Sequence, residues 1–333
     1  MKINKKVLKF SAVALGIIFV LLVAVVVYLY VTFKNNMERA GLIEDWDDSC
    51  GLVVNDISYG ENPLNTFDLF IPANVACTDS AALMLFIHGG SWMGGKKEDE
   101  HYACRRYAKR GVLTASMNYS LLGHADSPEA SIPAMLDEIG QCIDRAKSVA
   151  AEHGICLTQA SLSGTSAGGH LALLFAMRCG AQSALPIKFI AEKVGPVDMD
   201  ILFPSDSTEF MSALQGEDDG KRTEVTQLFY AVTGRHFDAD DVTWQLRDSA
   251  FTSVSPVSWV DSCNIPVLGA YGGKDFLVNT GHPKALEHAL DGRGTPHRII
   301  MFPNSGHTLA DDPDCRDSLQ AAVEEWMMLY FGL

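Results

Sequence analysis

Short apolar runs alternate with helical patterns along most of the chain. Residues 82–87 form a continuous apolar run, which is typical of a strand buried on both faces. Further strands are predicted at residues 112–118, 159–163, 188–194, 265–271 and 297–302. Apolar residues at helical spacing predict helices at 98–110, 133–151, 167–177, 283–290 and 321–331. This alternation predicts an α/β fold, with a mostly parallel central sheet covered by helices on both faces.

Two segments depart from that rhythm. Residues 55–59 and 66–71 alternate between apolar and polar, and a turn at 60–63 separates them, so we expect an antiparallel hairpin at a sheet edge. From about residue 196 to 254 no core strand is evident, and we interpret this insertion as a cap over a site. The alternative is a set of ordinary peripheral helices. Five bulky apolar side chains of the insertion are candidates for lining a pocket: Met199, Leu202, Phe203, Met211 and Phe229.

The N-terminus has the pattern of a membrane anchor. Four lysines precede an uncharged run at residues 10–33, which would span about 36 Å as a helix at ~1.5 Å per residue. That exceeds the ~30 Å hydrocarbon core, and the run is longer than the ~7–15 residues usual in a cleaved signal peptide. We therefore expect a basic tail at 1–9, a single transmembrane helix at 10–33, a linker at 34–51 and one domain at 52–333. The excess of lysine before the span favours a cell-membrane protein with a cytoplasmic N-terminus and an extracytoplasmic domain.

Composition narrows the possible partners. The net charge is −15, and because residues 1–34 hold five lysines and no acid, the remainder carries −20. Such a surface argues against binding nucleic acid, which requires a basic face. None of the eight cysteines forms a C-x-x-C pair, and the acidic run around Asp240 lacks the glycine and distal glutamate of an EF-hand, so no metal or other cofactor is predicted. Disulfide pairing and oligomeric state stay open, although Cys142 and Cys179 fall on helix faces as small buried hydrophobes would.

The junction between the 159–163 strand and the following helix carries the candidate chemistry. Residues 164–168 read Gly-Thr-Ser-Ala-Gly, which fits G-x-S-x-G. A strand that becomes a helix over so few residues needs a sharp bend, and only small residues two before and two after the serine leave room for it. The bend would expose the Ser166 hydroxyl at a helix N-terminus, where negative charge is favoured. We interpret Ser166 as a nucleophile; the alternative is a Gly-rich turn that lets the helix pack closely on the sheet.

A serine nucleophile needs a base and an acid that orients the base. His307 follows the 297–302 strand in a turn, and Asp275 follows the 265–271 strand in a Gly-rich turn, so both should lie at the carboxyl edge of the sheet. Asp198 is the second candidate for the acid. His170 is interpreted as a packing or helix-surface residue, and His282, His288 and His297 as surface residues.

The loop that leaves the 82–87 strand is rich in glycine. Residues 88–95 read His-Gly-Gly-Ser-Trp-Met-Gly-Gly, a composition that lets backbone N–H groups approach a substrate oxyanion. Gly89 and Gly90 are expected to supply donors, together with the amide of Ala167 after the nucleophile. His88 would orient the loop rather than transfer protons.

Together these pieces resemble the α/β-hydrolase fold, and within it the esterases related to hormone-sensitive lipase and the bacterial feruloyl or acetyl esterases. The matching motifs are His88-Gly-Gly, Asn118-Tyr119, residues 164–170, Ser255-Pro256, residues 273–275 and residues 305–307, over roughly residues 52–331. The resemblance implies Ser166 as nucleophile, Asp275 as acid, His307 as base, and Gly89, Gly90 and Ala167 as oxyanion donors. Ser91 departs from the pattern, because many relatives have a third glycine there.

We therefore expect a membrane-anchored serine hydrolase that cleaves a small-molecule carboxylic ester through an acyl-enzyme intermediate. Uncharged esters with short acyl chains are the expected substrates. Two alternatives stay open: a serine peptidase of the same fold, and a catalytically silent hydrolase-fold domain that serves in binding. The leaving group cannot be read from the sequence.

Overall fold

The computed structural model describes residues 46–75, 80–203 and 219–333. The predicted span at 10–33, its flanking basic tail, most of the 34–51 linker and Met211 lie outside these residues. Among the helices of the described residues, none has the length and apolar content needed to traverse a bilayer. The anchor and the localisation that follows from it therefore stay predictions.

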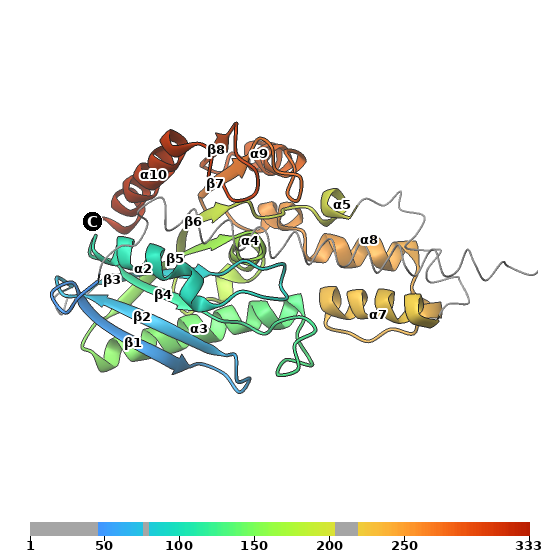
Figure 1. Cartoon of the computed structure of the whole chain (residues 1–333), viewed down its shortest axis with the longest axis horizontal. Coiled ribbons are helices and arrows are strands. Elements are labelled where there is room, and N and C mark those ends of the chain that lie inside the picture. Colours follow the sequence, from blue (N-terminus) through green and yellow to red (C-terminus); the bar gives the residue numbers. More distant parts are fainter. Residues whose placement is uncertain (1–45, 76–79, 204–218) are drawn as a thin grey trace, which may run out of the picture. The chain divides into compact units, whose positions relative to one another are not determined.

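An eight-stranded sheet forms the centre of the described structure (Figure 1), in the order β1-β2-β4-β3-β5-β6-β7-β8. β1 pairs antiparallel with β2, and β2 pairs antiparallel with β4, whereas all the other neighbours are parallel. The strands are β1 (Gly51–Ser58), β2 (Thr66–Pro72), β3 (Ala81–Ile87), β4 (Leu113–Met117), β5 (Leu157–Thr165), β6 (Ile187–Lys193), β7 (Val267–Gly272) and β8 (His297–Phe302). The predicted α/β class, the mostly parallel sheet and the antiparallel edge hairpin are confirmed.

Two helical layers cover the sheet. The helices are α2 (His101–Ala108), α3 (Ile132–Glu152), α4 (Ala167–Cys179), α5 (Met199–Leu202), α7 (Asp219–Thr233), α8 (Trp244–Ser253), α9 (Gly281–Arg293) and α10 (Pro313–Phe331). Short 3₁₀ turns lie at η1 (Lys97–Glu100), η2 (Gly180–Gln182), η3 (Ala239–Asp241) and η4 (Pro256–Ser262). α2 and α10 share one apolar cluster, whereas α3, α4 and α9 share another.

The continuous apolar run in β3 follows from this sandwich. Leu83, Leu85 and Ile87 enter the cluster with α3 and α4, whereas Met84 and Phe86 enter the cluster with α2 and α10. Because successive strand residues point to opposite faces, a strand covered on both sides needs apolar side chains at every position. All seven residues of β3 are buried.

Local signals fix the ends of several helices. Ser131 caps α3 by accepting a hydrogen bond from the Ala134 amide at 3.3 Å, and Pro133 occupies the first turn, where its missing N–H is not needed. α9 and α10 end at Gly294 and Gly332, whose φ angles of 71° and 75° are left-handed and favour glycine. The bounds of α3 lie close to the predicted 133–151, and α10 ends at the predicted residue 331. The predicted start of α10 at residue 321 is wrong, because the helix begins at Pro313.

The predicted insertion contains α5, α7, η3 and α8 and, in its described residues, no strand. α7 lies against α3 and α8, and Phe229 of α7 is buried against Phe237. Arg247 of α8 ties the insertion together: its guanidinium pairs with Asp200, donates to the Phe203 carbonyl at 2.7 Å and stacks over Phe251. Of the candidate pocket-lining residues, Met199 and Phe229 belong to the core, whereas Phe203 is exposed.

The last residues of the predicted linker belong to the described part of the chain. Trp46 packs edge-on against Phe70, with ring centroids 5.7 Å apart, so the C-terminal end of the predicted linker contacts the domain.

The seven cysteines in the described part of the chain are free thiols, and Cys77 lies outside it. Cys142 is buried as predicted, and Cys179 is half-buried.

The core of β5 gives a test of this packing. Leu162 is fully buried, whereas Leu329 on α10 is 66% exposed. We expect Leu162→Ala to lower the free energy of unfolding by about 2–5 kcal/mol, because it leaves a cavity in a close-packed layer. The matched Leu329→Ala should change it by less than about 0.5 kcal/mol. Urea denaturation of both variants measures this, and equal effects would contradict the assignment of β5 to the core.

Candidate active site

Ser166 occupies a strained turn between β5 and α4. It adopts φ 56° and ψ −120°, which lies outside the regions that residues with a side chain normally adopt. Its amide donates to the carbonyl of Lys193 at the end of β6, at 2.8 Å. The turn therefore depends on the neighbouring strand, and it places the hydroxyl at the N-terminus of α4, where the helix dipole favours negative charge.

The two glycines of the motif are required by close approach. A Cβ at Gly168 would overlap the carbonyl oxygens of Ile87 and His88, and one at Gly164 would overlap the carbonyl of Gly168. The first contact brings the start of α4 against the end of β3, and the second closes the bend itself. The predicted steric reason for G-x-S-x-G therefore holds in this structure.

His307 and Asp275 lie with Ser166 at the carboxyl ends of three strands. His307 follows β8, and its Nε2 lies 2.9 Å from the Ser166 Oγ. Asp275 follows β7, and its Oδ2 lies 2.7 Å from the His307 Nδ1. A carboxylate only accepts hydrogen bonds, so Nδ1 donates to Asp275 and Nε2 is left to accept the serine proton. The structure thus brings together the three residues that the sequence nominated.

Backbone donors fix the orientation of the acid. Asp275 is 5% exposed, and its Oδ1 accepts hydrogen bonds from the amides of Leu277 and Val278 at 2.9 and 3.0 Å. Asp198, the second candidate, instead caps α5 by accepting from the Asp200 amide at 2.9 Å. No hydrogen bond joins Asp198 to His307 among the described residues, so the geometry favours Asp275.

The 88–95 loop lies against Ser166. A Cβ at Gly89 would approach the Thr165 carbonyl oxygen to 2.8 Å and the Ser166 Cβ to 3.3 Å, which shows how closely this backbone passes. Gly90 adopts φ 120°, and its carbonyl accepts from the amides of Met93 and Gly94, each at 3.0 Å, which closes the loop into a tight turn. In the described hydrogen-bond network, the amides of Gly89, Gly90 and Ala167 have no backbone carbonyl partner.

His88 is buried and stacked on Tyr119, with ring centroids 4.3 Å apart. Its Nδ1 lies 2.8 Å from the Gly89 carbonyl, and its own carbonyl accepts from the Tyr119 hydroxyl at 3.0 Å. Burial lowers the pKa of His88 to about 4, although the Gly89 hydrogen bond acts in the opposite direction. A neutral, wedged imidazole fits the predicted role of orienting the loop.

Two histidines are buried more deeply than surface residues would be. His170 is fully buried, which agrees with packing and excludes the helix surface, and its Nε2 donates to the Val254 carbonyl at 2.7 Å. The prediction of a surface position for His282 is wrong: it is fully buried, and its Nδ1 accepts from the Val197 amide at 3.2 Å. Helical spacing alone did not reveal that the insertion covers this face of α9.

Trp92 contributes to the site without having been singled out. Both Ser91 and Trp92 adopt left-handed φ angles, 54° and 59°. The Trp92 Nε1 donates to the His170 Nδ1 at 3.3 Å, and the rings meet edge-on. The loop is therefore anchored to α4 through a side chain as well as through its glycines. The sequence signal was the bulky aromatic residue within an otherwise small, flexible loop.

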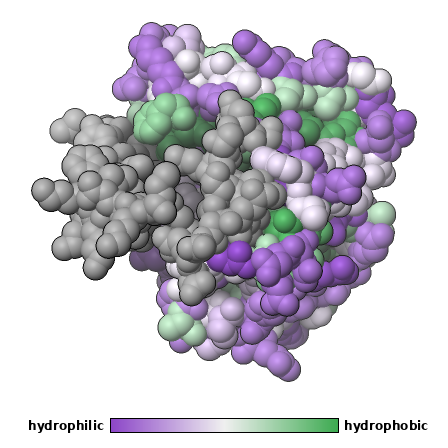
Figure 2. Space-filling view, turned by 90° about the vertical axis from the view of Figure 1, so that its right-hand side faces the viewer, coloured by the Kyte–Doolittle hydropathy of each residue, from purple (hydrophilic) through white to green (hydrophobic). Residues whose placement is uncertain are grey.

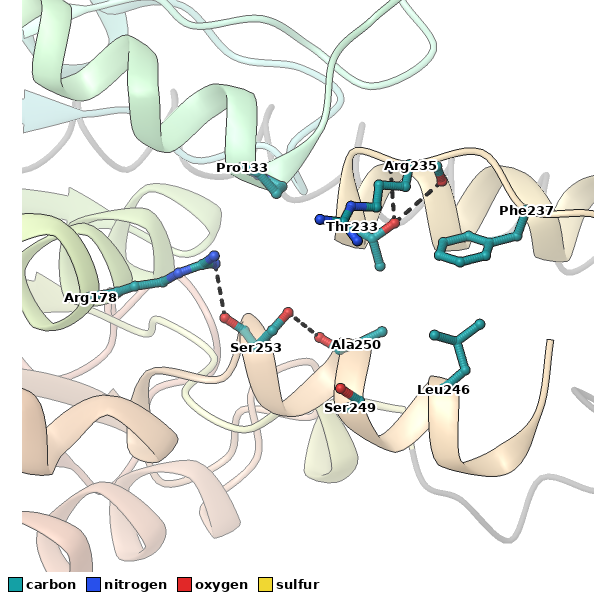
Figure 3. Close-up of a pocket in the computed structure, with 9 residues that line it drawn as sticks. All are labelled: Pro133, Arg178, Thr233, Arg235, Phe237, Leu246, Ser249, Ala250 and Ser253. Carbon is teal, nitrogen blue, oxygen red and sulfur yellow. Dashed lines mark hydrogen bonds between the residues drawn. The ribbon is translucent and has the colours of Figure 1, made fainter. Parts of the chain in front are cut away.

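The carboxyl ends of the parallel strands point toward the side shown in Figure 2, where the coloured surface is mostly hydrophilic with a few apolar areas near its centre. A cavity of about 250 Å³ lies between α3, α4, α7 and α8, and Arg178 and Arg235 point into it (Figure 3). It adjoins the C-terminal end of α4 at Arg178, about 18 Å along that helix from Ser166 at ~1.5 Å per residue. None of the three candidate triad residues lines it.

Comparison with known proteins identifies first the fold class of this chain and then its family. The fold and the strand-turn-helix site are those of the α/β hydrolases. The BD-FAE family model matches residues 67–290, and the chain belongs to that family. The dienelactone hydrolase family model also matches, over residues 250–331. The resemblance drawn from the motifs is therefore confirmed.

Curated relatives are similar over parts of their length. Esterase LipQ of Mycobacterium tuberculosis is 23% identical over 84% of this chain and 62% of its own length. A probable isoprenylcysteine alpha-carbonyl methylesterase of Oryza sativa subsp. japonica is 32% identical over 36% of this chain and 27% of its own length. The chain thus spans less than two thirds of either relative.

Solved structures share the fold. Esterase B from Lactobacillus rhamnosis superposes with a TM-score of 0.64 at 17% identity, covering 92% of this chain and 96% of that one. A truncated carbohydrate esterase from gut microbiota gives a TM-score of 0.62 at 16% identity, with 85% and 99% coverage. At these identities the likeness concerns the fold alone.

The site predicts a clear division among variants. Ser166→Ala and His307→Ala should each lower kcat of any hydrolysis by about 10⁴–10⁶, because either change removes the nucleophile or its proton acceptor. Asp275→Asn should lower it by about 10⁴, whereas the matched Asp198→Asn should leave it within about tenfold. Turnover with p-nitrophenyl acetate and circular dichroism measure activity and fold. A wild-type rate in Asp275→Asn would remove Asp275 from the site.

Proposed function

We propose that this protein is a serine carboxylic-ester hydrolase that acts through Ser166, His307 and Asp275. The observation that carries the proposal is the hydrogen-bonded chain from the Ser166 hydroxyl through His307 to Asp275 at the carboxyl ends of β5, β8 and β7. Membership of the BD-FAE family supports it, as do curated relatives and structural neighbours that are named as esterases.

The geometry suits acyl transfer in two steps. His307 Nε2 takes the proton of Ser166 as the hydroxyl oxygen attacks the ester carbonyl, and Asp275 stabilises the imidazolium that forms. The imidazolium then returns the proton to the departing alcohol, which leaves an acyl group on Ser166. A water molecule, deprotonated by the same His307, attacks the acyl-enzyme and releases the acid. Serine, base and proton are then restored.

The oxyanion requires fixed donors. In the proposed mechanism, the amides of Gly89, Gly90 and Ala167 receive the negative charge that develops on the ester carbonyl oxygen. Gly89 lies directly beside the serine, and Ala167 opens α4, whose N-terminal dipole adds to the same effect. His88 and Trp92 hold the loop by stacking and hydrogen bonding, so the donors need little rearrangement during the reaction.

We propose small, uncharged esters with short acyl chains as substrates. Phe276, next to Asp275, is 67% exposed, and Met93, in the 88–95 loop, is 59% exposed, which offers apolar contact near the site. The 196–254 insertion is suited to roof the site, although Met199 and Phe229 are engaged in its core. The net charge of −20 beyond residue 34 disfavours anionic substrates modestly at physiological salt.

Two other functions remain distinguishable from this one. A catalytically silent binding domain would not need a serine, an imidazole and a carboxylate within hydrogen-bonding distance of one another. Here the three are joined by hydrogen bonds. A serine peptidase of the same fold would use the same three residues on an amide bond. Hydrolysis of esters in the absence of peptidase activity separates these possibilities.

We also propose that residues 10–33 anchor the protein in the cell membrane, with the hydrolase domain outside the cytoplasm. The uncharged run and the lysines before it support this, and these residues lie outside the described part of the chain. The anchor does not imply lipid substrates, because the predicted linker at 34–51 separates the span from the hydrolase domain.

The substrate proposal is tested by a series of p-nitrophenyl esters from acetate to palmitate. We expect kcat/KM to be greatest between acetate and about hexanoate, because a roofed pocket leaves little room for longer chains. Peptide p-nitroanilides serve as the control for peptidase activity. A maximum at about twelve carbons or longer would make the protein a lipase and contradict the proposal.

The anchor is tested by fractionation. Full-length protein should sediment with membranes and resist extraction by alkaline carbonate, whereas a variant lacking residues 1–34 should be soluble and retain its kcat. Recovery of soluble protein that begins near residue 40 would show cleavage of a signal peptide instead.

A further inference from the structure

Glu192 lies directly beneath the nucleophile turn. It is a residue of β6, and it is fully buried. Three glycines surround its carboxyl group: a Cβ would lie 3.2 Å from Oε2 at Gly169, 2.9 Å from Oε2 at Gly195 and 2.7 Å from Oε1 at Gly269. α4, the loop after β6, and β7 thus each lack a side chain where the carboxyl group sits. The space is shaped for this residue.

The carboxyl group closes the turn that supports Ser166. Its Oε2 accepts a hydrogen bond from the Gly195 amide at 2.8 Å. Lys193 and Val194 lie between Glu192 and Gly195. The Lys193 carbonyl accepts a hydrogen bond from the Ser166 amide at 2.8 Å, and Val194 adopts φ 48°. A β-branched residue rarely adopts such an angle, so the turn must be held by its surroundings.

Both backbone groups of Gly195 are held by buried side chains. Its amide is bound by Glu192, and its carbonyl accepts from the Tyr271 hydroxyl at 2.9 Å. The space at Gly195 is also tight toward α4, since a Cβ there would lie 2.9 Å from the His170 amide nitrogen. Movement of Gly195 would therefore be transmitted to Lys193 on one side and to the first turn of α4 on the other.

The surroundings favour a neutral carboxyl group. Oε1 has no hydrogen-bond partner in the described part of the chain, and a buried anionic oxygen without a donor is costly. Burial raises the pKa of Glu192 to about 8, whereas the Gly195 amide, the Tyr271 hydroxyl and the Lys193 charge act in the opposite direction. The titratable groups around it are Lys193 on β6, Tyr271 on β7 and His170 on α4; burial keeps His170 neutral by lowering its pKa to about 4.

We propose that Glu192 is a positioning residue for Ser166: its Oε2 holds the 192–195 turn through the Gly195 amide, and its ionisation disturbs that turn because the unpartnered Oε1 then requires a donor. The inference rests on the proposed ester hydrolysis by Ser166. Glu192 does not touch the reacting atoms: it acts through the Lys193 carbonyl and the Gly195 backbone. An ionised carboxylate in this pocket would draw in water or donors, and the geometry of the nucleophile would change with it.

The test compares full-length wild type, Glu192→Gln and the control Glu287→Gln, which alters an exposed residue of α9. Two rates are measured from pH 6 to 9.5: kcat for p-nitrophenyl acetate and covalent labelling by a fluorophosphonate, with Ser166→Ala as the blank. In wild type and Glu287→Gln both rates should fall above pH about 8, by up to about thirtyfold at pH 9.5, where only about 3% of Glu192 is neutral. Glu192→Gln has a side chain that stays neutral. Its rates should therefore stay at their pH 7 values up to pH 9.5, with an unchanged KM.

Stability supplies a second readout that does not require turnover. The folded state binds the Glu192 proton more tightly than the unfolded chain, so wild-type stability should decline as pH rises from about 4.5 to about 8 and level off above it. Glu192→Gln lacks this contribution. Its Tm minus that of wild type should therefore increase across the same interval, whereas the difference for Glu287→Gln should not.

The outcomes separate this inference from the proposed function. Labelling with the expected pH profile, but no ester hydrolysis in any variant, would reject the ester substrate and keep the role of Glu192. An alkaline fall that is the same in Glu192→Gln and wild type would overturn the role of Glu192, as would a Tm difference independent of pH. If Glu192→Gln does not fold, wild-type labelling decides, and a rate that does not fall above pH about 8 overturns the proposal.

Discussion

The site depends on one backbone constraint, the left-handed conformation of Ser166 between β5 and α4. A serine at φ 56° is unfavourable by itself, so the neighbouring structure must compensate for it. Lys193 binds the serine amide, Gly168 lets α4 press against the end of β3, and Gly89 lets the next loop pass beside the Ser166 Cβ. These contacts come from the ends of β3 and β6, on either side of β5, so the bend is stable only within the assembled sheet.

The parallel topology explains how distant residues reach the same place. Asp275 and His307 are separated by α9 and β8, yet both follow strands that run in the direction of β5. Parallel strands bring their carboxyl ends to one edge, where loops are free to vary while the strands fix their origins. The sheet therefore determines where each side chain starts, and short-range contacts, such as the Leu277 and Val278 amides on Asp275, determine where it points.

Much of this arrangement could be predicted from the sequence, because it follows from local rules. The apolar run at 82–87 indicates a strand covered twice, and the glycines flanking Ser166 are required by the bend itself. Other features depend on contacts between distant segments and leave no local pattern. The burial of His282 arises from the Val197 backbone, and the anchoring of the 88–95 loop arises from Trp92 on His170. Glu192 looks like an ordinary polar residue in a strand until three glycines from separate elements surround it.

The central claim is that the Ser166 hydroxyl, activated by His307, is the group that reacts. The most direct measurement is mass spectrometry of the protein after reaction with a fluorophosphonate, with the modified residue identified by peptide mapping. We expect a single phosphonylated residue, Ser166, and loss of labelling in His307→Ala. Modification of another residue, or unchanged labelling of Ser166 without His307, would contradict it.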